Sequence, residues 1–175
     1  RLPLIRFFRG IADAQAVAYS TSSSSATLPI TIQCVQKNLG VSQSVSSSVL
    51  PLGATINMDG TALYLGIVAL FSAQYFGIDL ALSDYFLIAL TVTLTSIGTA
   101  GIPSASLFLL AAVLSVIGIS DTQTALIVGF IFPVDRVLDM ARTVVNITGD
   151  ATVSVIVAKS ENELDESTFR HEAVI

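Results

Sequence analysis

Apolar runs of near membrane-spanning length alternate along the chain with short stretches of small, polar or charged residues. The most informative polar stretch, residues 135–150, follows one such run and carries polar side chains at helical spacing. At about 100° per residue these side chains fall within an arc of about 80° on one helix face. These residues are Asp135, Asp139, Arg142, Asn146 and Asp150. The rest of the circumference is largely apolar, so the pattern predicts a helix with an apolar outer side and an ionic inner side.

Composition decides between two interpretations of this helix. In a soluble protein, water would solvate its charged face. The chain is 53% hydrophobic and 12% charged, with a mean hydropathy of +0.78, which favours an integral membrane protein. Ionisable groups inside a bilayer are costly, face the protein interior or a watery cavity, and usually mark a ligand site or a pathway. The polar face is therefore predicted to be functional.

The serine-rich stretch 21–25 lies between two apolar helical segments of about 12 residues each. Each segment would reach only about 18 Å, whereas the hydrocarbon core is about 30 Å thick. The pattern therefore predicts a re-entrant helical hairpin that enters and leaves on one side. The free backbone groups at its tip are tolerated at membrane depth only where they are buried or line a cavity.

A second apolar segment, from about residue 45 to residue 78, is interrupted by Pro51, Gly53 and the polar cluster at 57–61. This pattern predicts one membrane crossing that is broken midway, with carbonyl and side-chain oxygens able to hold a cation. The alternative is a loop between two short helices, with Asn57 and Asp59 capping the second helix. Neither half would then be long enough to span the bilayer.

Residues 85–117 repeat the first hairpin pattern: a short apolar helix, a small-residue tip, a proline and a second apolar helix. The predicted fold is an all-α integral membrane protein with two oppositely oriented re-entrant hairpins, one broken transmembrane helix and a final polar transmembrane helix. Such inverted repeats place substrate and ion sites near the middle of the membrane, where the helices are discontinuous.

Charge sets the expected orientation. Arg1, Arg6 and Arg9 lie at one end of the chain, whereas the loops 77–84 and 118–124 contain no Lys or Arg. By the positive-inside rule, the N-terminal end and the C-terminal tail face the cytoplasm in a multi-pass cell-membrane protein. Residues 1–159 are expected to form the membrane core, and residues 160–175 an acidic, poorly ordered cytoplasmic tail. Because the chain begins with Arg and not Met, it is expected to be the C-terminal part of a larger protein.

Several functional classes are disfavoured. The single cysteine, Cys34, allows no intrachain disulfide and no zinc site, and the scattered Lys and Arg residues predict no nucleic-acid surface. The only histidine, His171, is in the tail, so the serines at 22–25 lack a general base, and no Gly-x-Ser-x-Gly elbow is present. An intramembrane hydrolase is therefore not expected, and the chain is predicted not to be an enzyme. Paired Asp139 and Arg142 favour stoichiometric binding over conduction through a channel.

Four motifs in this order resemble the glutamate transporter family, the dicarboxylate/amino acid:cation symporters: SSSSATLP, LPLGATINMDGT, SIGTAGIP and DMARTVVNITGD. The resemblance extends from Arg9 to Lys159. It implies the C-terminal transport core of an elevator-type secondary transporter that assembles as a homotrimer in membrane lipid. It also implies symport of an acidic amino acid with sodium, and that the N-terminal scaffold half is needed for transport.

The resemblance assigns roles to individual residues. Arg142 matches the arginine that holds the substrate side-chain carboxylate, in keeping with the paired bonds that a guanidinium makes, and Asp139 matches the aspartate that binds the amino group. The other implied substrate contacts are Asn146, Thr143, Thr61, Ser23, Ser24 and Gly101. The implied cation sites are Gly53, Asn57, Asn146 and Asp150; Asn57 and Asp59; and Thr55, Ser96, Ile97 and Thr99 with the Met58 sulfur nearby. Such hard oxygen ligands suit a small cation.

Some alternatives stay open at this point. Some archaeal members of the family have an arginine where this chain has Ser22, and animal members have one where it has Met140; Arg136 is a possible substitute. Some bacterial members with closely similar motifs use protons, so proton-coupled symport of glutamate, aspartate or a C4-dicarboxylate is the alternative to sodium coupling. One methylene is worth only about 1–3 kcal/mol in a pocket, so the sequence does not separate aspartate from glutamate.

Overall fold

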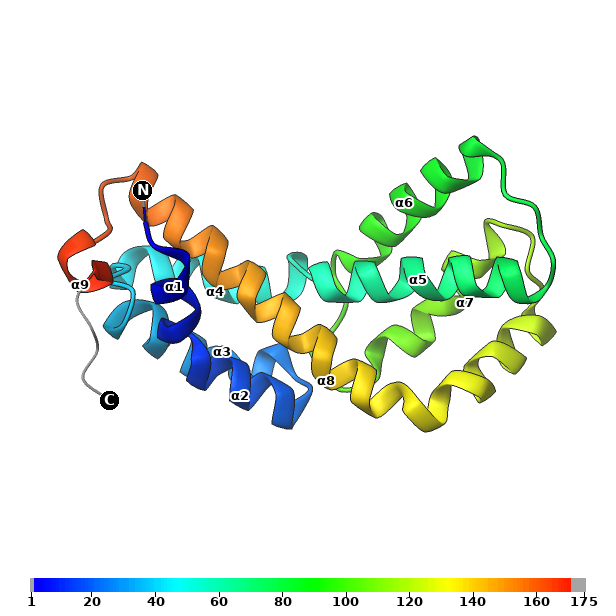
Figure 1. Ribbon diagram of the computed structural model, residues 1–175, viewed down its shortest axis with the longest axis horizontal. Coiled ribbons are helices and arrows are strands. Elements are labelled where there is room, and N and C mark those ends of the chain that lie inside the picture. The colour runs from blue at the N-terminus through cyan, green and yellow to red at the C-terminus, as the bar shows by residue number, and fades with distance from the viewer. Residues whose placement is uncertain (1, 171–175) are drawn as a thin grey trace.

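The computed structural model describes residues 2–170, and every regular element in that range is a helix, as the sequence predicts. In chain order these elements are α1 (Leu4–Gly10), α2 (Ala12–Thr21), α3 (Ser24–Lys37), α4 (Gln43–Ile56), α5 (Asp59–Tyr75), α6 (Leu82–Ser96), the 3-10 helix η1 (Ala105–Leu109), α7 (Leu110–Ser115), α8 (Asp121–Ser160) and α9 (Glu166–Arg170). The molecule is elongated, with its two ends joined by α4, α5 and α8 (Figure 1).

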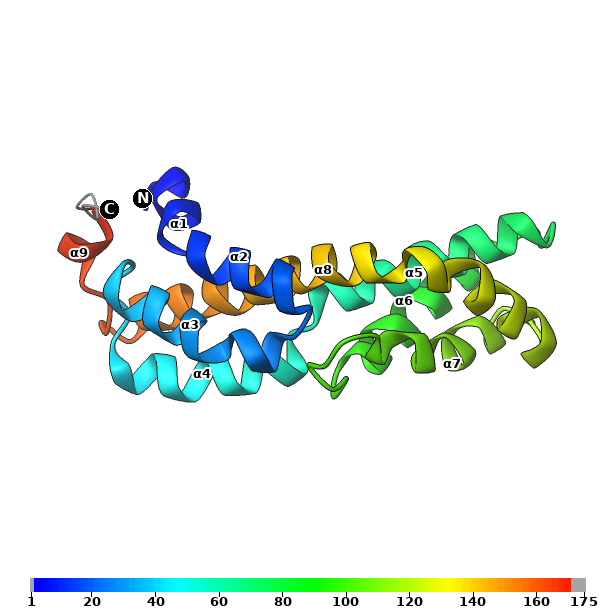
Figure 2. The same ribbon diagram turned by 90° about the horizontal axis from the view of Figure 1, so that it is seen from below.

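Two helical hairpins point toward each other from opposite ends of the molecule (Figure 2). Hairpin 1 consists of α2 and α3, and hairpin 2 consists of α6 followed by η1 and α7. Their tips are in contact, because the Ser23 hydroxyl donates a 2.6 Å hydrogen bond to the Gly101 carbonyl. The Ser25 main-chain N–H donates to the same carbonyl at 3.3 Å. The two small-residue stretches found in the sequence therefore meet in the middle of the fold.

The expected interruption between residues 45 and 78 is present, but it is narrower than the sequence suggested. Only Asn57 and Met58 separate α4 from α5, and α4 runs through both Pro51 and Gly53. By length and composition alone, 43–75 is the one stretch within residues 2–170 that is long and apolar enough to cross a membrane. Its single break falls beside the hairpin tips (Figure 1).

Helix α8 is 40 residues long, which corresponds to about 60 Å at 1.5 Å per residue, and it continues through Pro133. It belongs to both apolar cores of the protein. Ile127 and Ile131 pack with α5, α6 and α7 in one core. Further along α8, Ile147, Ala151 and Val155 pack with hairpin 1 and α4 in the other core. The polar face of α8 therefore lies between two apolar clusters, at the level of the hairpin tips.

The expectation of a poorly ordered tail is wrong for residues 161–170. The Ser42 N–H donates to the Glu163 carbonyl at 3.0 Å, and the Asp165 N–H donates to the Gly40 carbonyl at 2.8 Å. In α9, the Phe169 side chain is 1% exposed and belongs to the same core as hairpin 1. The rest of the predicted tail, residues 171–175, lies outside the described residues, as does Arg1. Residues 161–170 therefore form a clasp on the loop between α3 and α4.

Polar contacts support the same clasp. The Asp165 carboxylate accepts hydrogen bonds from the hydroxyls of Ser167, at 2.5 Å, and Thr168, at 2.6 Å. These bonds, the Ser167 hydroxyl first, stabilise the charged carboxylate and lower the pKa of Asp165 to about 2. The Glu166 carboxylate pairs with Lys159 at the end of α8 and with Arg170. These hydrogen bonds and ion pairs therefore fix the start of α9.

Replacing Phe169 with alanine should release this clasp. A Phe→Ala change in a core typically costs about 3–5 kcal/mol, and here only the short segment 161–170 need detach. Hydrogen exchange followed by mass spectrometry on the full-length protein should show faster exchange in that segment and in 38–43, with the rest of the chain unchanged. Phe108→Ala, at a side chain that is 86% exposed, is the control. Unchanged protection in Phe169→Ala would contradict this account.

Candidate functional site

The polar face predicted for α8 is buried throughout. Asp135 and Asp139 are each 2% exposed, Asn146 and Asp150 are each 3% exposed, and Arg142 is 6% exposed. The prediction of one ionic face directed inward is therefore confirmed. Burying five such groups costs free energy unless each is paired or hydrogen-bonded, so their partners define what the site can do.

Arg142 is held by two carboxylates of its own helix. Its Nη2 atom lies 2.6 Å from Oδ1 of Asp139, and its Nη1 atom lies 3.6 Å from Oδ1 of Asp135. The guanidinium carbon is 4.5 Å from the centre of the Tyr64 ring on α5, which adds a cation–π contact. Within the described part of the chain, however, the buried Nη1 atom has no hydrogen-bond partner. The guanidinium is therefore fixed in place, and its Nη1 group can still donate hydrogen bonds.

Hairpin 2 is attached to the same two carboxylates through Ser104. Its N–H donates to Oδ2 of Asp139 at 2.7 Å, and its hydroxyl donates to Oδ2 of Asp135 at 3.1 Å. Ser104 has a φ of 58°, a left-handed conformation that is uncommon for a residue with a side chain. The Tyr64 hydroxyl completes the set by donating to Oδ1 of Asp135 at 3.0 Å. The position of the hairpin tip therefore depends on the two aspartates.

Asn146 holds the break between α4 and α5. Its Oδ1 atom accepts from the N–H groups of Gly60, at 2.8 Å, and Thr61, at 3.4 Å, at the start of α5. Its Nδ2 atom lies 3.2 Å from the sulfur of Met58 and 3.4 Å from the Thr61 hydroxyl. The side chain of Asn146 thus satisfies two of the N–H groups that a helix start leaves without intrahelical partners.

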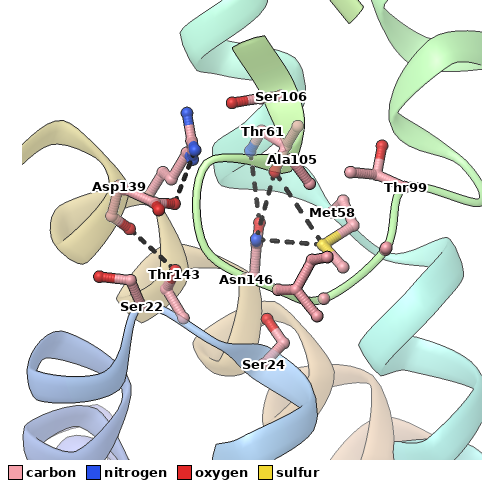
Figure 3. A pocket seen from close by; sticks show the side chains of 14 residues that line it. Ser22, Ser24, Met58, Thr61, Thr99, Ala105, Ser106, Asp139, Thr143 and Asn146 are labelled. Atoms are coloured by element: carbon pink, nitrogen blue, oxygen red, sulfur yellow. Dashed lines mark hydrogen bonds and ion pairs between the residues drawn. The ribbon is translucent and has the colours of Figure 1, made fainter. Parts of the chain in front are cut away.

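These groups surround one polar cavity, here called the central cavity, where both hairpin tips, the α4–α5 break and α8 meet (Figure 3). Its lining residues are Ser22, Ser24, Met58, Thr61, Thr99, Ala100, Gly101, Ile102, Ala105, Ser106, Asp139, Arg142, Thr143 and Asn146. The space that they enclose is about the size of one water molecule. A larger ligand therefore requires the Arg142–Asp139 pair to separate and hairpin 2 to move.

A model of one family, described as the sodium:dicarboxylate symporter family, matches residues 1–160, which include both hairpins, the broken helix and all of α8. The chain belongs to this symporter family. The resemblance carried by the four sequence motifs is thereby confirmed.

Relatives with assigned names agree with this membership. The putative sodium-dependent excitatory amino acid transporter glt-4 of Caenorhabditis elegans is 48% identical over 155 residues, which are 89% of this chain and 30% of the relative. Human excitatory amino acid transporter 3 is 44% identical over 171 residues, 97% of this chain and 32% of the relative. Human excitatory amino acid transporter 2 is 42% identical over 166 residues, 94% of this chain and 28% of the relative. The chain thus spans less than a third of the length of these relatives.

The residues assigned to substrate from the symporter-family motifs gather at the central cavity, with one exception. Arg142, Asp139, Asn146, Thr143, Thr61, Ser24 and Gly101 all line it. Ser23 does not line it, because the Ser23 hydroxyl donates to Gly101 and accepts from the Ala26 N–H, so it joins the tips and caps α3. The residues that the motifs imply for substrate therefore lie together at one cavity, and their contacts with a substrate stay a prediction.

Of the first predicted cation set, three residues lie together next to the α4–α5 break. The Asn57 amide donates to Oδ1 of Asp150 at 3.1 Å, and Gly53 packs directly against the Asp150 side chain. Asn146, one turn away on α8, instead turns its side chain to the start of α5. Asp59, from the second set, is exposed and lies against Gly149. Both carboxylates thus lie near the break, that of Asp150 on α8 and that of Asp59 at the start of α5.

The third predicted cation set brings hairpin 2 to the end of α4. The Gly98 N–H donates to the Thr55 carbonyl at 3.0 Å, and the Thr99 N–H donates to the Ser96 carbonyl at 3.2 Å. Ile97 follows α6 with an extended backbone. Within residues 2–170, no cluster of three or more His, Cys, Asp or Glu side chains forms a metal cage. Cation binding here would depend largely on carbonyl and amide oxygens, which suit a small, hard cation.

Sequence reasoning missed some members of the site. Asp135 was placed on the correct face without a role, and Tyr64 lies one turn after Thr61, so helical spacing would have identified it. Ser104 takes its role from a left-handed backbone that its sequence context does not reveal. Ser106 was not singled out, yet it lines the central cavity. Arg136, considered as a substitute cation, is exposed and does not line the cavity.

A methyl group at Gly60 should disrupt this site. A Cβ atom there would collide with the main-chain carbonyl of Arg142, which cannot yield without separating α5 from α8. Overpacking of this kind costs about 1–3 kcal/mol or more. Thermal unfolding of full-length Gly60→Ala should show a lower Tm and weakened ligand binding. Gly66→Ala, with open space around the added atom in the same helix, is the matched control. Equal Tm values for the two variants would contradict the close contact.

Proposed function

We propose that this chain is the substrate- and ion-binding core of a symporter that carries acidic amino acids together with sodium. The observation that carries the proposal is the buried pair of Arg142 and Asp139, one turn apart in a cavity closed by two hairpin tips. The pair presents one cation and one anion to any ligand that separates it. A ligand with a carboxylate and an ammonium group would replace both lost partners.

The two charges narrow the class of substrate. A C4-dicarboxylate has no ammonium group and would leave Asp139 buried without a partner. A neutral amino acid has no side-chain carboxylate and would leave Arg142 buried without a partner. An unpaired buried charge typically costs several kcal/mol. An acidic amino acid satisfies both residues. The names of the relatives, which are excitatory amino acid transporters, support the same choice.

Sodium is proposed as the co-transported ion, and protons are the alternative. The oxygen groups near the break, from Asn57, Asp150 and the Thr55 carbonyl, are the ligands that a small hard cation prefers. Two carboxylates lie near this region, that of Asp150 beside Gly53 and that of Asp59 beside Gly149. A cation between them would relieve their mutual repulsion and that of an anionic substrate.

The membrane setting follows from the lengths of the hairpin arms. Helices α2 and α3, with 10 and 14 residues, reach about 15 Å and 21 Å. A hydrocarbon core of about 30 Å would hold both arms as a re-entrant hairpin, with its tip near the midplane. We propose that the two hairpins and the polar helix move together as an elevator-type transport domain. In this arrangement the protein is a cell-membrane homotrimer with residues 1–159 as the moving core and both chain ends in the cytoplasm.

Arg142→Cys tests the recognition of the substrate side chain. Without the guanidinium, aspartate affinity of the full-length protein should fall at least about 100-fold, since breaking a buried pair costs about 3–5 kcal/mol. Small neutral amino acids should begin to bind. Arg136→Cys, at an exposed arginine on the same helix, is the control and should bind aspartate normally. Retained aspartate affinity in Arg142→Cys would show that another group reads the side chain.

Sodium coupling is tested by titration calorimetry of the full-length protein with aspartate over a range of sodium concentrations at fixed ionic strength. Aspartate affinity should rise with sodium, and by linkage aspartate should raise sodium affinity by the same factor. Asp150→Asn should flatten this dependence, whereas Asp121→Asn, at the exposed start of α8, should not. If aspartate affinity were independent of sodium concentration but changed with pH, protons would be the co-transported ion and sodium coupling would be refuted.

A further inference from the structure

The hydroxyl of Ser106 is a buried polar atom whose purpose the fold does not explain. The residue is 1% exposed, and its Oγ atom has no hydrogen-bond partner in the described part of the chain. Its neighbours along η1 are the apolar residues Leu107, Phe108 and Leu109. A buried hydroxyl without a partner destabilises a fold, whereas alanine would fill nearly the same space without that penalty.

Ser106 is positioned by contacts that already belong to the site. It follows Ser104 by two residues, and Ser104 is bonded to both Asp139 and Asp135. Those bonds fix the start of η1 relative to α8. Ser106 lines the central cavity, and Figure 3 shows it across the cavity from Ser24. Its hydroxyl is therefore held at the hairpin 2 side of the space into which a ligand would bind.

Two further unpartnered polar atoms line the same cavity. They are Nη1 of Arg142 and the hydroxyl of Ser22. The other side-chain atoms of this kind among the described residues, Nε of Arg6 and the hydroxyl of Ser154, belong to residues that do not line it. Unused hydrogen-bonding capacity is therefore concentrated where the cavity is, and it consists of groups able to donate. A ligand that supplies acceptor oxygens would satisfy them.

We propose that the Ser106 hydroxyl is a second donor to the substrate's side-chain carboxylate, beside Arg142. This rests on the function proposed above. Nη1 of Arg142 has no hydrogen-bond partner among the described residues, although it lies 3.6 Å from Asp135. When a ligand separates Arg142 from Asp139, Nη1 can therefore bind one oxygen of the ligand's side-chain carboxylate. The second oxygen is then met by the hydroxyl on η1 when hairpin 2 closes. Because Ser106 lies on hairpin 2, the same contact would make closure of this hairpin depend on the presence of an acidic side chain.

The test compares Ser106→Ala with Ser154→Ala in the full-length protein. Ser154 is also fully buried with an unpartnered hydroxyl, but it lies outside the cavity. Ser106→Ala should bind aspartate about ten-fold or more weakly, because a hydrogen bond to a charged group is lost. Ser154→Ala should bind it as the wild type does. Both variants should unfold at the wild-type Tm or above, since each removes an unsatisfied hydroxyl.

A double variant separates a ligand contact from an indirect effect. If Ser106 and Arg142 hold the same carboxylate, Ser106→Ala combined with Arg142→Cys should bind aspartate within about two-fold of Arg142→Cys alone. The proposal would be overturned if Ser106→Ala bound aspartate as tightly as the wild type. It would also be overturned if the losses of binding free energy in the two single variants added fully in the double variant. Either result would leave the proposed function intact. A wild-type protein that binds no aspartate would instead remove the proposed function itself.

Discussion

The buried ion pair between Arg142 and Asp139 is the constraint on which the rest of the site depends. Two charges inside a protein are stable only while they compensate each other and their remaining hydrogen-bonding groups are satisfied. Here the compensation extends to Asp135, Tyr64 and Ser104, so the pair fixes one helix and one hairpin at once. A ligand that separates the pair leaves both charges without partners unless it offers the same charges in exchange. Under the proposed function, the pair would therefore select for such a ligand.

Helix interruptions supply what a continuous helix cannot. At the α4–α5 break and at the two tips, main-chain N–H and C=O groups are free of helical partners and face the centre of the molecule. The absence of a side chain at Gly60 lets α5 approach the main chain of Arg142. Short hairpins joined by the Ser23–Gly101 bond then enclose the same space from both ends. Both hairpin tips and the α4–α5 break therefore contribute residues to the cavity wall.

Periodicity predicted the parts of this structure that repeat, and failed where a single backbone conformation decides. The inward face of α8 follows from 3.6-residue spacing, so Asp139 through Asp150 were placed correctly. Pro51 was predicted to be part of the interruption, but α4 continues through it and ends only at Ile56. The clasp of the tail depends on one buried ring, Phe169, in a charged segment whose composition indicates disorder. The left-handed turn at Ser104 has no sequence signature comparable to glycine.

The regions proposed for the cation and for the substrate are connected through α8 and the α4–α5 break. Asn146 bonds the start of α5, and Asp150, one turn further along α8, accepts from Asn57 at the end of α4. Both sides of the break are therefore held by one rigid helix face that also presents Arg142. A cation that draws Asp150 away from Asn57 would shift the break, and the break carries Thr61 and Met58 into the cavity wall. Under the proposed function, coupling between cation and substrate would need no long pathway, since a single turn of α8 separates Asn146, proposed to contact the substrate, from Asp150, proposed to contact the cation.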